Sequence, residues 1–168
     1  MTYSYSILYI YATDSQYGPT ASLDKLPRME VDYAFIAESA DAQNGLFYVV
    51  RGGTDVWYVP AGSTYPLPIG PMSLVIRLSG ERSEIGRQLP VSFTIVDADG
   101  RPIGIEGNGE IVFGEHGVDR TRTGGALLHF RLGFAVPAQG AFIFQLFSDG
   151  QRLCQVPFWI VESPNTPK

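Results

Sequence analysis

The stretch AFIFQLFSDGQRLCQVPFWIVE, residues 141–162, decides the fold. Apolar side chains occupy every second position in each of its two halves. These positions are Phe142, Phe144 and Leu146 in the first half and Cys154, Val156, Phe158 and Ile160 in the second. Side chains two residues apart lie on one face of a β-strand, so each half is predicted to be a strand with one buried face. Asp149-Gly150 between them tolerates positive φ angles and predicts a tight hairpin turn.

Similar segments follow one another along the whole chain, and helical periodicity is absent because 19 glycines and 12 prolines interrupt almost every longer window. The segments predicted as strands are residues 33–38, 45–51, 55–59, 72–79, 91–97, 110–114, 126–133, 141–148 and 152–162. Many short strands separated by turns are typical of a sandwich or barrel. We therefore predict an all-β, Ig-like antiparallel sandwich of about 8–10 strands whose two sheets enclose one core.

The turns between these segments predict which strands are neighbours. Asn44-Gly45 and Asp99-Gly100 are hairpin signals of the same kind as Asp149-Gly150. Gly52-Gly53 is expected to let residues 45–51 fold back on residues 55–59 as an antiparallel pair. Four prolines crowd residues 60–72, which predicts a rigid extended crossover from one sheet to the other.

At 168 residues and 18.4 kDa, the chain is long enough for one domain with its own core. We assign residues 30–162 to the sandwich, residues 1–29 to an N-terminal extension and residues 163–168 to a flexible tail. Tyrosines at alternate positions from Tyr3 to Tyr11 predict an extra strand in the extension, followed by a loop. Met29 directly precedes the first strong strand, which suggests the hypothesis that translation starts there and that residues 1–28 are optional.

From Glu30 onward, the order of motifs resembles an uncharacterised bacterial family of small Ig-like β-sandwich proteins, a domain of unknown function. The motifs are VDYAFIAE (31–38), NGLFYVVRGG (44–53), VDADGRP (96–102) and the Asp149-Gly150 turn that leads into VPF (156–158). The sequence GERSEIG (80–86) replaces a polar loop that contains tryptophan in many members. The resemblance implies the fold over residues 30–162, and it implies no catalytic residue and no ligand.

Charge and apolar patterning exclude several classes of protein. A net charge of −5, from 12 basic and 17 acidic residues, leaves no basic surface for nucleic acid. No apolar run approaches the ~18 residues that span a bilayer, so we expect no membrane contact. No positively charged segment precedes the apolar residues 7–12, so we expect a cytoplasmic protein without a secretion signal. Cys154 is the only cysteine and is expected to be a small buried hydrophobe.

The candidates for metal ligands are weak. Asp97, Asp99 and Glu106 match the third, fifth and twelfth positions of a calcium loop, but Ile95 at the first position has no oxygen ligand. A plain hairpin turn is the favoured interpretation. His116 is predicted in a loop and His129 on the polar side of a strand, both as solvated surface residues. We predict no metal and no cofactor.

The sequence offers no set of acid, base and nucleophile that would make an enzyme, so we predict a protein that binds. Alternation places several aromatic side chains opposite the predicted core. The candidate interaction residues are Tyr48, Trp57, Tyr58, Phe147 and Trp159. We expect contact with a protein partner or self-association through a sheet edge or this aromatic face. The alternative is a module that binds a small ligand or a carbohydrate through loop residues such as Asp97, Asp99 and His116. A metal-dependent hydrolase is a distant third.

Overall fold

The computed structural model describes residues 7–9, 29–43, 46–114 and 124–164. Within these residues the chain is all-β, with one short 3₁₀ turn at Arg82–Glu84. The ten strands are β1 (Ile7–Tyr9), β2 (Glu30–Gln43), β3 (Leu46–Gly52), β4 (Val56–Val59), β5 (Leu67–Gly80), β6 (Gln88–Asp97), β7 (Pro102–Val112), β8 (Gly124–Val136), β9 (Gly140–Ser148) and β10 (Gln151–Glu162). The described residues contain no helix that is long and apolar enough to cross a membrane.

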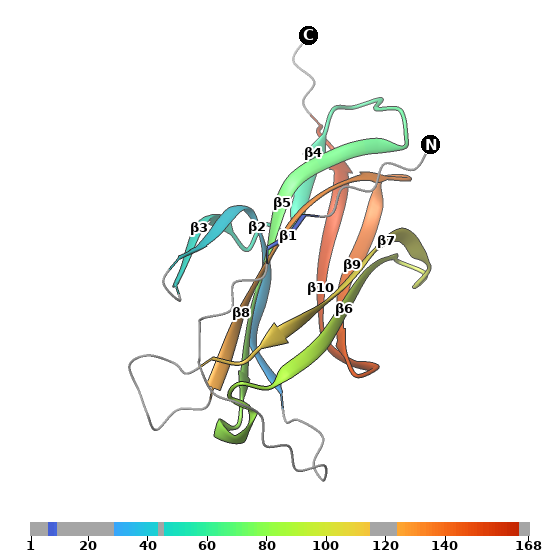
Figure 1. The fold of residues 1–168 in the computed structure, drawn as a ribbon. Coiled ribbons are helices and arrows are strands. Elements are labelled where there is room, and N and C mark those ends of the chain that lie inside the picture. Colours follow the sequence, from blue (N-terminus) through green and yellow to red (C-terminus); the bar gives the residue numbers. More distant parts are fainter. Residues whose placement is uncertain (1–6, 10–28, 44–45, 115–123, 165–168) are drawn as a thin grey trace.

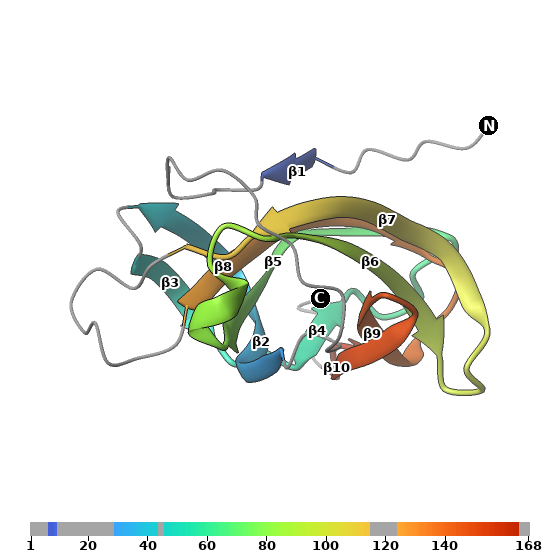
Figure 2. The same ribbon diagram turned by 60° about the horizontal axis from the view of Figure 1, so that its bottom comes forward.

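The strands form two sheets of five (Figures 1 and 2). The first sheet has the order β1-β8-β5-β2-β3, and the second has the order β4-β10-β9-β6-β7. All pairs are antiparallel except β4 and β10, which run parallel. β1 lies inside the segment for which alternating tyrosines predict an extra strand, and it pairs with β8.

One apolar core takes side chains from both sheets. The alternation expected from the sequence is confirmed, because Phe142, Phe144 and Leu146 are buried while Ile143 and Gln145 between them are partly exposed. Phe93 stacks on Phe144 of the neighbouring strand β9 with ring centroids 5.1 Å apart, and across the core it meets Phe130 of β8 edge-on at 5.3 Å. Such ring pairs add about 0.5–1.5 kcal/mol to the free energy gained from burial alone.

The prediction that residues 45–51 fold back on residues 55–59 through Gly52-Gly53 is wrong. β3 does not fold back on β4, because β3 pairs with β2 in the first sheet while β4 pairs with β10 in the second. The turn therefore carries the chain from one sheet to the other, and Gly53 accordingly has a φ of +78°. The crossover of residues 60–66 returns the chain to the first sheet as expected, but β5 begins at Leu67, before the predicted residue 72.

β7 is also longer than expected, since it extends over Pro102–Val112. Sequence analysis predicted a strand only over residues 110–114, because glycines interrupt the apolar pattern of residues 102–109. Gly107 is required by packing, because an added Cβ would lie 2.5 Å from Cε1 of Phe93. The lack of a side chain at Gly107 therefore lets the ring of Phe93 approach the backbone of β7 closely.

Candidate functional site

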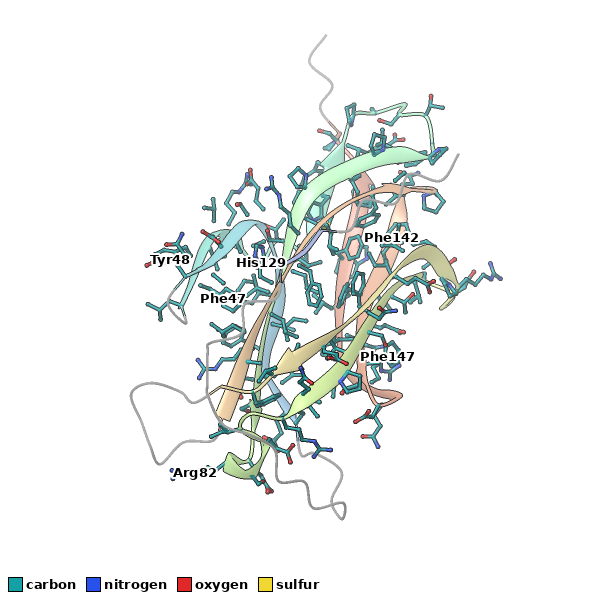
Figure 3. All side chains as sticks on the ribbon, in the orientation of Figure 1. Phe47, Tyr48, Arg82, His129, Phe142 and Phe147 are labelled. Carbon is teal, nitrogen blue, oxygen red and sulfur yellow. The ribbon has the colours of Figure 1, made fainter. Side chains whose placement is uncertain are left out.

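The end of β2 leaves the first sheet and forms a two-stranded arm with β3. β2 pairs with β5 only as far as Ala37, opposite Ser73. Residues 37–43 then pair with β3, from Ala37 opposite Gly52 to Gln43 opposite Leu46. Figure 1 shows this arm standing away from β10, β9 and β6, and Figure 3 places Tyr48 near its outer end. We call residues 38–43 together with β3 the arm.

Hydrogen bonds on β2 indicate which backbone groups of β3 lack a strand partner within the part of the chain that the structure describes. The N–H of Ala40 donates to Oγ of Ser73 at 3.0 Å, and the N–H of Ala42 donates to its neighbour Asp41. Since Ser73 lies on β5, the amide of Ala40 points away from β3, and the alternation along a strand directs the amide of Ala42 the same way. In an antiparallel pair, the residues opposite such positions also turn their N–H and C=O groups away. These residues are Val49, opposite Ala40, and Phe47, opposite Ala42. The outer edge of β3 thus presents the backbone donors and acceptors of Phe47 and Val49.

The side chains along this edge are apolar and uncharged. Leu46 is 62% exposed, Tyr48 56% and Val50 57%, all on one face of the arm. Val49, on the other face, is 37% exposed. The first charged residue of β3 is Arg51, whose guanidinium pairs with Glu38 at 3.0 Å. β3 therefore offers five consecutive uncharged residues along a backbone edge that no other described strand covers.

The other described edges are protected in ways that β3 is not. β7 begins with Pro102 and carries the exposed carboxylates Glu106 and Glu110. β4 is four residues long and is followed by Pro60, and β1 has three residues. Charges, prolines and short length are the usual protection of edge strands against unwanted pairing. Among the described edges, β3 alone combines seven residues with an uncharged apolar centre.

A groove of about 930 Å³ lies between the arm and the body of the protein. Its lining comes from the arm, β4, β5 and β8, and includes Asp41, Arg51, Trp57, Tyr58, Ser73, His129 and Arg131. Two polar side chains are buried beneath the arm, Ser73 at 3% exposure and His129 at 8%. Oγ of Ser73 lies 3.2 Å from Nε2 of His129, and Figure 3 shows His129 between the arm and β8.

Burial lowers the pKa of His129 below 6.5. The charge of Asp41 acts in the opposite direction, and Arg131 adds a smaller lowering effect. The imidazole is therefore neutral at neutral pH, as suits a ring that shares a hydrogen bond with the hydroxyl of Ser73. The expectation of a solvated surface histidine is wrong for His129, because the arm covers the outward face of β8 there. His116 lies outside the described residues.

The five candidate aromatic residues do not form one surface. Tyr58 is 68% exposed and lies beside Val161, while Trp159 is 38% exposed and lies beside Val56, all on the outer face of the second sheet. Phe147 points to the same face of β9 and is partly buried. Tyr48 lies on the arm of the other sheet. Trp57 packs partly against the core.

Trp57 has a further feature, since its Nε1 atom is buried without a hydrogen-bond partner in the described residues. A buried indole N–H normally finds an acceptor, because leaving it unpaired costs about 1–3 kcal/mol. Trp57 also lines the groove. The groove therefore brings together the aromatic side chains of Trp57 and Tyr58 with a set of polar side chains.

The acidic candidates form a turn. The Oδ1 atom of Asp97 accepts the N–H groups of Asp99 at 2.9 Å and of Arg101 at 2.8 Å, and Asp99 pairs with Arg101. Glu106 lies on β7 opposite Thr94. Within the part of the chain that the structure describes, no group of three or more His, Cys, Asp or Glu residues could hold a metal ion. The half-buried thiol of Cys154 packs on the core, and burial raises its pKa to about 11.

Sequence analysis named Tyr48 as a candidate interaction residue but not its exposed neighbours Leu46 and Val50 on β3. The available signal was the lack of charge between Asn44 and Arg51 in a predicted strand. It could not have found the contact of Ala40 with Ser73 or of Ser73 with His129, because these residues are 33 and 56 positions apart.

The comparisons with known proteins give a family and a partial structural likeness. A search of the curated proteins finds no match. One similar solved structure is the alkylpurine DNA glycosylase AlkC of Pseudomonas fluorescens bound to DNA containing an abasic site analog, with a TM-score of 0.41 and 11% identity over 82% of this chain. This chain spans 31% of that protein's length. The model of DUF6941, a family of unknown function, matches residues 32–161, and the chain belongs to that family.

Proposed function

We propose that this chain is a non-enzymatic protein-binding module that accepts an extended segment of a protein along the free edge of β3. The observation that carries the proposal is the open backbone of Phe47 and Val49 in a strand with no charge from Leu46 to Val50. In strand addition, backbone hydrogen bonds provide affinity and alternate side chains provide specificity. Leu46, Tyr48 and Val50 supply the apolar contacts on one face of the arm.

A proline at position 49 tests whether binding depends on the backbone edge of β3 and not on side chains alone. The N–H of Val49 points away from β2, so Val49→Pro removes a donor from the outer edge and leaves the β2–β3 ladder intact. Val161→Lys, on the outer face of the second sheet, is the matched control, because Val161 is exposed to the same degree as Val49.

The experiment uses the wild-type chain and both variants as bait in extracts of the native host, with chemical cross-linking and mass spectrometry. We expect cross-links between a captured chain and residues 46–52 in the wild type and in Val161→Lys, and their loss in Val49→Pro. Circular dichroism verifies that all three baits are folded. Capture that is unchanged by Val49→Pro, or the absence of any chain cross-linked to β3, would contradict the proposal.

The aromatic and polar lining of the groove favours a second candidate function, the binding of a small polar ligand such as a carbohydrate. Sugar sites combine an aromatic surface with several hydrogen-bonding groups, and Tyr58, Asp41 and Arg131 supply these beside Trp57. A panel of monosaccharides and disaccharides tests this by thermal shift. A rise in Tm that Trp57→Phe abolishes would support it, and no rise at millimolar sugar would rule it out.

A further inference from the structure

We propose that the segment bound by β3 is β3 of a second copy, paired antiparallel about a two-fold axis that passes beside Tyr48. This inference rests on the proposed function and names its partner. It follows from three features of the arm: the direction of its free backbone groups, the side-chain pattern of its edge and the position of its charges.

The two-fold axis restricts the register of such a pair. A two-fold axis perpendicular to the sheet places the same face of both arms on the same side of the joined sheet. Because directly opposite residues of two paired strands share a face, a residue of β3 can face only a residue of the same face in the second copy. The allowed registers therefore place Phe47, Tyr48 or Val49 opposite itself, and they differ by steps of one residue in the position of the axis.

The register centred on Tyr48 matches apolar residues at every position. It places Tyr48 opposite Tyr48, Leu46 opposite Val50, and Phe47 opposite Val49 in the second copy. Phe47 and Val49 are the residues whose N–H and C=O groups point outward. The two Phe47–Val49 pairs therefore exchange four backbone hydrogen bonds, and the Tyr48 pair lies between them as a non-hydrogen-bonded pair, where side chains approach most closely.

The neighbouring registers are poorer. Centring the axis on Val49 places the charged Arg51 opposite Phe47 and Leu46 opposite Gly52, so that part of the uncharged segment is paired with residues beyond it. Centring it on Phe47 leaves Val50 opposite position 44, outside β3. Only the register centred on Tyr48 covers the whole uncharged segment.

A second copy fits this edge better than a charged partner does. Although each chain carries a net charge of −5, the segment from Leu46 to Val50 has no charge that would repel its copy. It also has no charge that would select an acidic or basic partner strand. The pattern is complementary to itself, as a two-fold interface requires.

Charge substitutions at position 48 test the register, because the proposal places that residue opposite itself. The purified full-length chain is studied by sedimentation equilibrium over a wide concentration range, as wild type, Tyr48→Lys and Tyr48→Glu. We expect the wild type to form dimers and each variant to associate at least about tenfold more weakly, since like charges lie directly opposite. An equimolar mixture of the two variants should recover dimers, because Lys then faces Glu. Val161→Lys is the control and should dimerise like the wild type.

Cysteine cross-linking gives an independent reading. The Cα atoms of a non-hydrogen-bonded pair are about 4.5 Å apart, within the range for a disulfide. Tyr48→Cys should oxidise to a covalent dimer. Leu46→Cys alone and Val50→Cys alone should not form one, because neither residue lies opposite itself. A mixture of Leu46→Cys and Val50→Cys should form a covalent dimer. Cys154 stays protonated at neutral pH, and the wild type gives the background level.

A wild-type chain that stays monomeric at every concentration would overturn this inference. A dimer that survives both Tyr48→Lys and Tyr48→Glu, with no gain on mixing, would overturn it as well. The proposed function has a separate failure, because host proteins other than this chain could still be captured through β3 and lost in Val49→Pro. The two sets of results therefore distinguish the wrong partner from the wrong surface.

Discussion

The backbone N–H of Ala40 donates to Oγ of Ser73 at 3.0 Å, and this bond marks the point at which β2 has left β5. The same hydroxyl lies 3.2 Å from Nε2 of His129 on β8. A buried serine thus joins the arm to two strands of the first sheet. Because the bond turns the amide of Ala40 away from β3, it also identifies the free backbone groups on the outer edge of the arm.

Replacing Ser73 should destabilise the protein. Ser73→Ala leaves the amide of Ala40 and the ring nitrogen of His129 without their partner beneath the arm, and an unpaired buried polar group costs about 1–3 kcal/mol. Urea unfolding should therefore show a loss of that size in the free energy of unfolding. Ser39→Ala, at an exposed position of the same arm, should change it by less than about 0.5 kcal/mol. Equal effects of the two substitutions would show that Ser73 does not hold the arm.

The stability of the protein should fall as the pH drops below 6.5. The pKa of His129 is lower in the folded state, chiefly because of burial, so the unfolded chain takes up a proton before the folded chain does. Above this range the imidazole is neutral in both states and contributes no pH dependence. Urea unfolding at pH 7.5 and 5.5 should therefore show a larger loss for the wild type than for His129→Gln. The same loss in both proteins would assign it to other groups.

Gly107 should not tolerate a side chain. A Cβ at this position would lie 2.5 Å from Cε1 of Phe93, so Gly107→Ala must displace a ring that stacks on Phe144. Overpacking of this kind costs about 1–3 kcal/mol. Gly133→Ala is the matched control, because the nearest atom to its Cβ is the carbonyl oxygen of Ile69 at 3.9 Å. Thermal unfolding should show a clearly lower Tm for Gly107→Ala alone, and equal Tm values would contradict the packing described for β7.

Two adjacent aromatic residues of β4 should differ in their contribution to stability. Trp57 packs against the core, so Trp57→Ala should lower the free energy of unfolding by about 3 kcal/mol. Tyr58 is 68% exposed, so Tyr58→Ala should cost less than about 1 kcal/mol. Guanidinium unfolding of both variants measures the difference. A larger loss for Tyr58→Ala would show that Tyr58, and not Trp57, is on the face of β4 that packs against the core.

Much of the fold could be predicted from the sequence because the side-chain period of a strand is local. The pattern from Phe142 to Leu146 specifies one buried face without reference to any other segment. Asp149 and Gly150 have φ angles of +48° and +75°, as their hairpin requires. These features depend on neighbouring residues alone. The Ig-like topology and the bacterial origin implied by the resemblance stay predictions.

The pairing of β4 and the position of the arm could not be predicted in this way. The double glycine Gly52-Gly53 permits a turn, but it does not determine whether the chain stays in its sheet or crosses to the other. His129 appears in the sequence as a polar residue on the outward side of a strand, and its burial depends on the arm and on Ser73, which are distant in the chain. Both features depend on contacts between segments far apart in the chain.

Amide hydrogen exchange along β3, followed by nuclear magnetic resonance, tests most directly whether this edge is free to bind. In dilute solution we predict rapid exchange at Phe47 and Val49, whose N–H groups point outward, and slow exchange at Tyr48, whose N–H the alternation directs toward Asp41 on β2. At high concentration, Phe47 and Val49 should become protected while Tyr48 changes little. Slow exchange at Phe47 and Val49 at every concentration would show that the edge is already covered within one chain, and rapid exchange throughout would show that no second strand is added there.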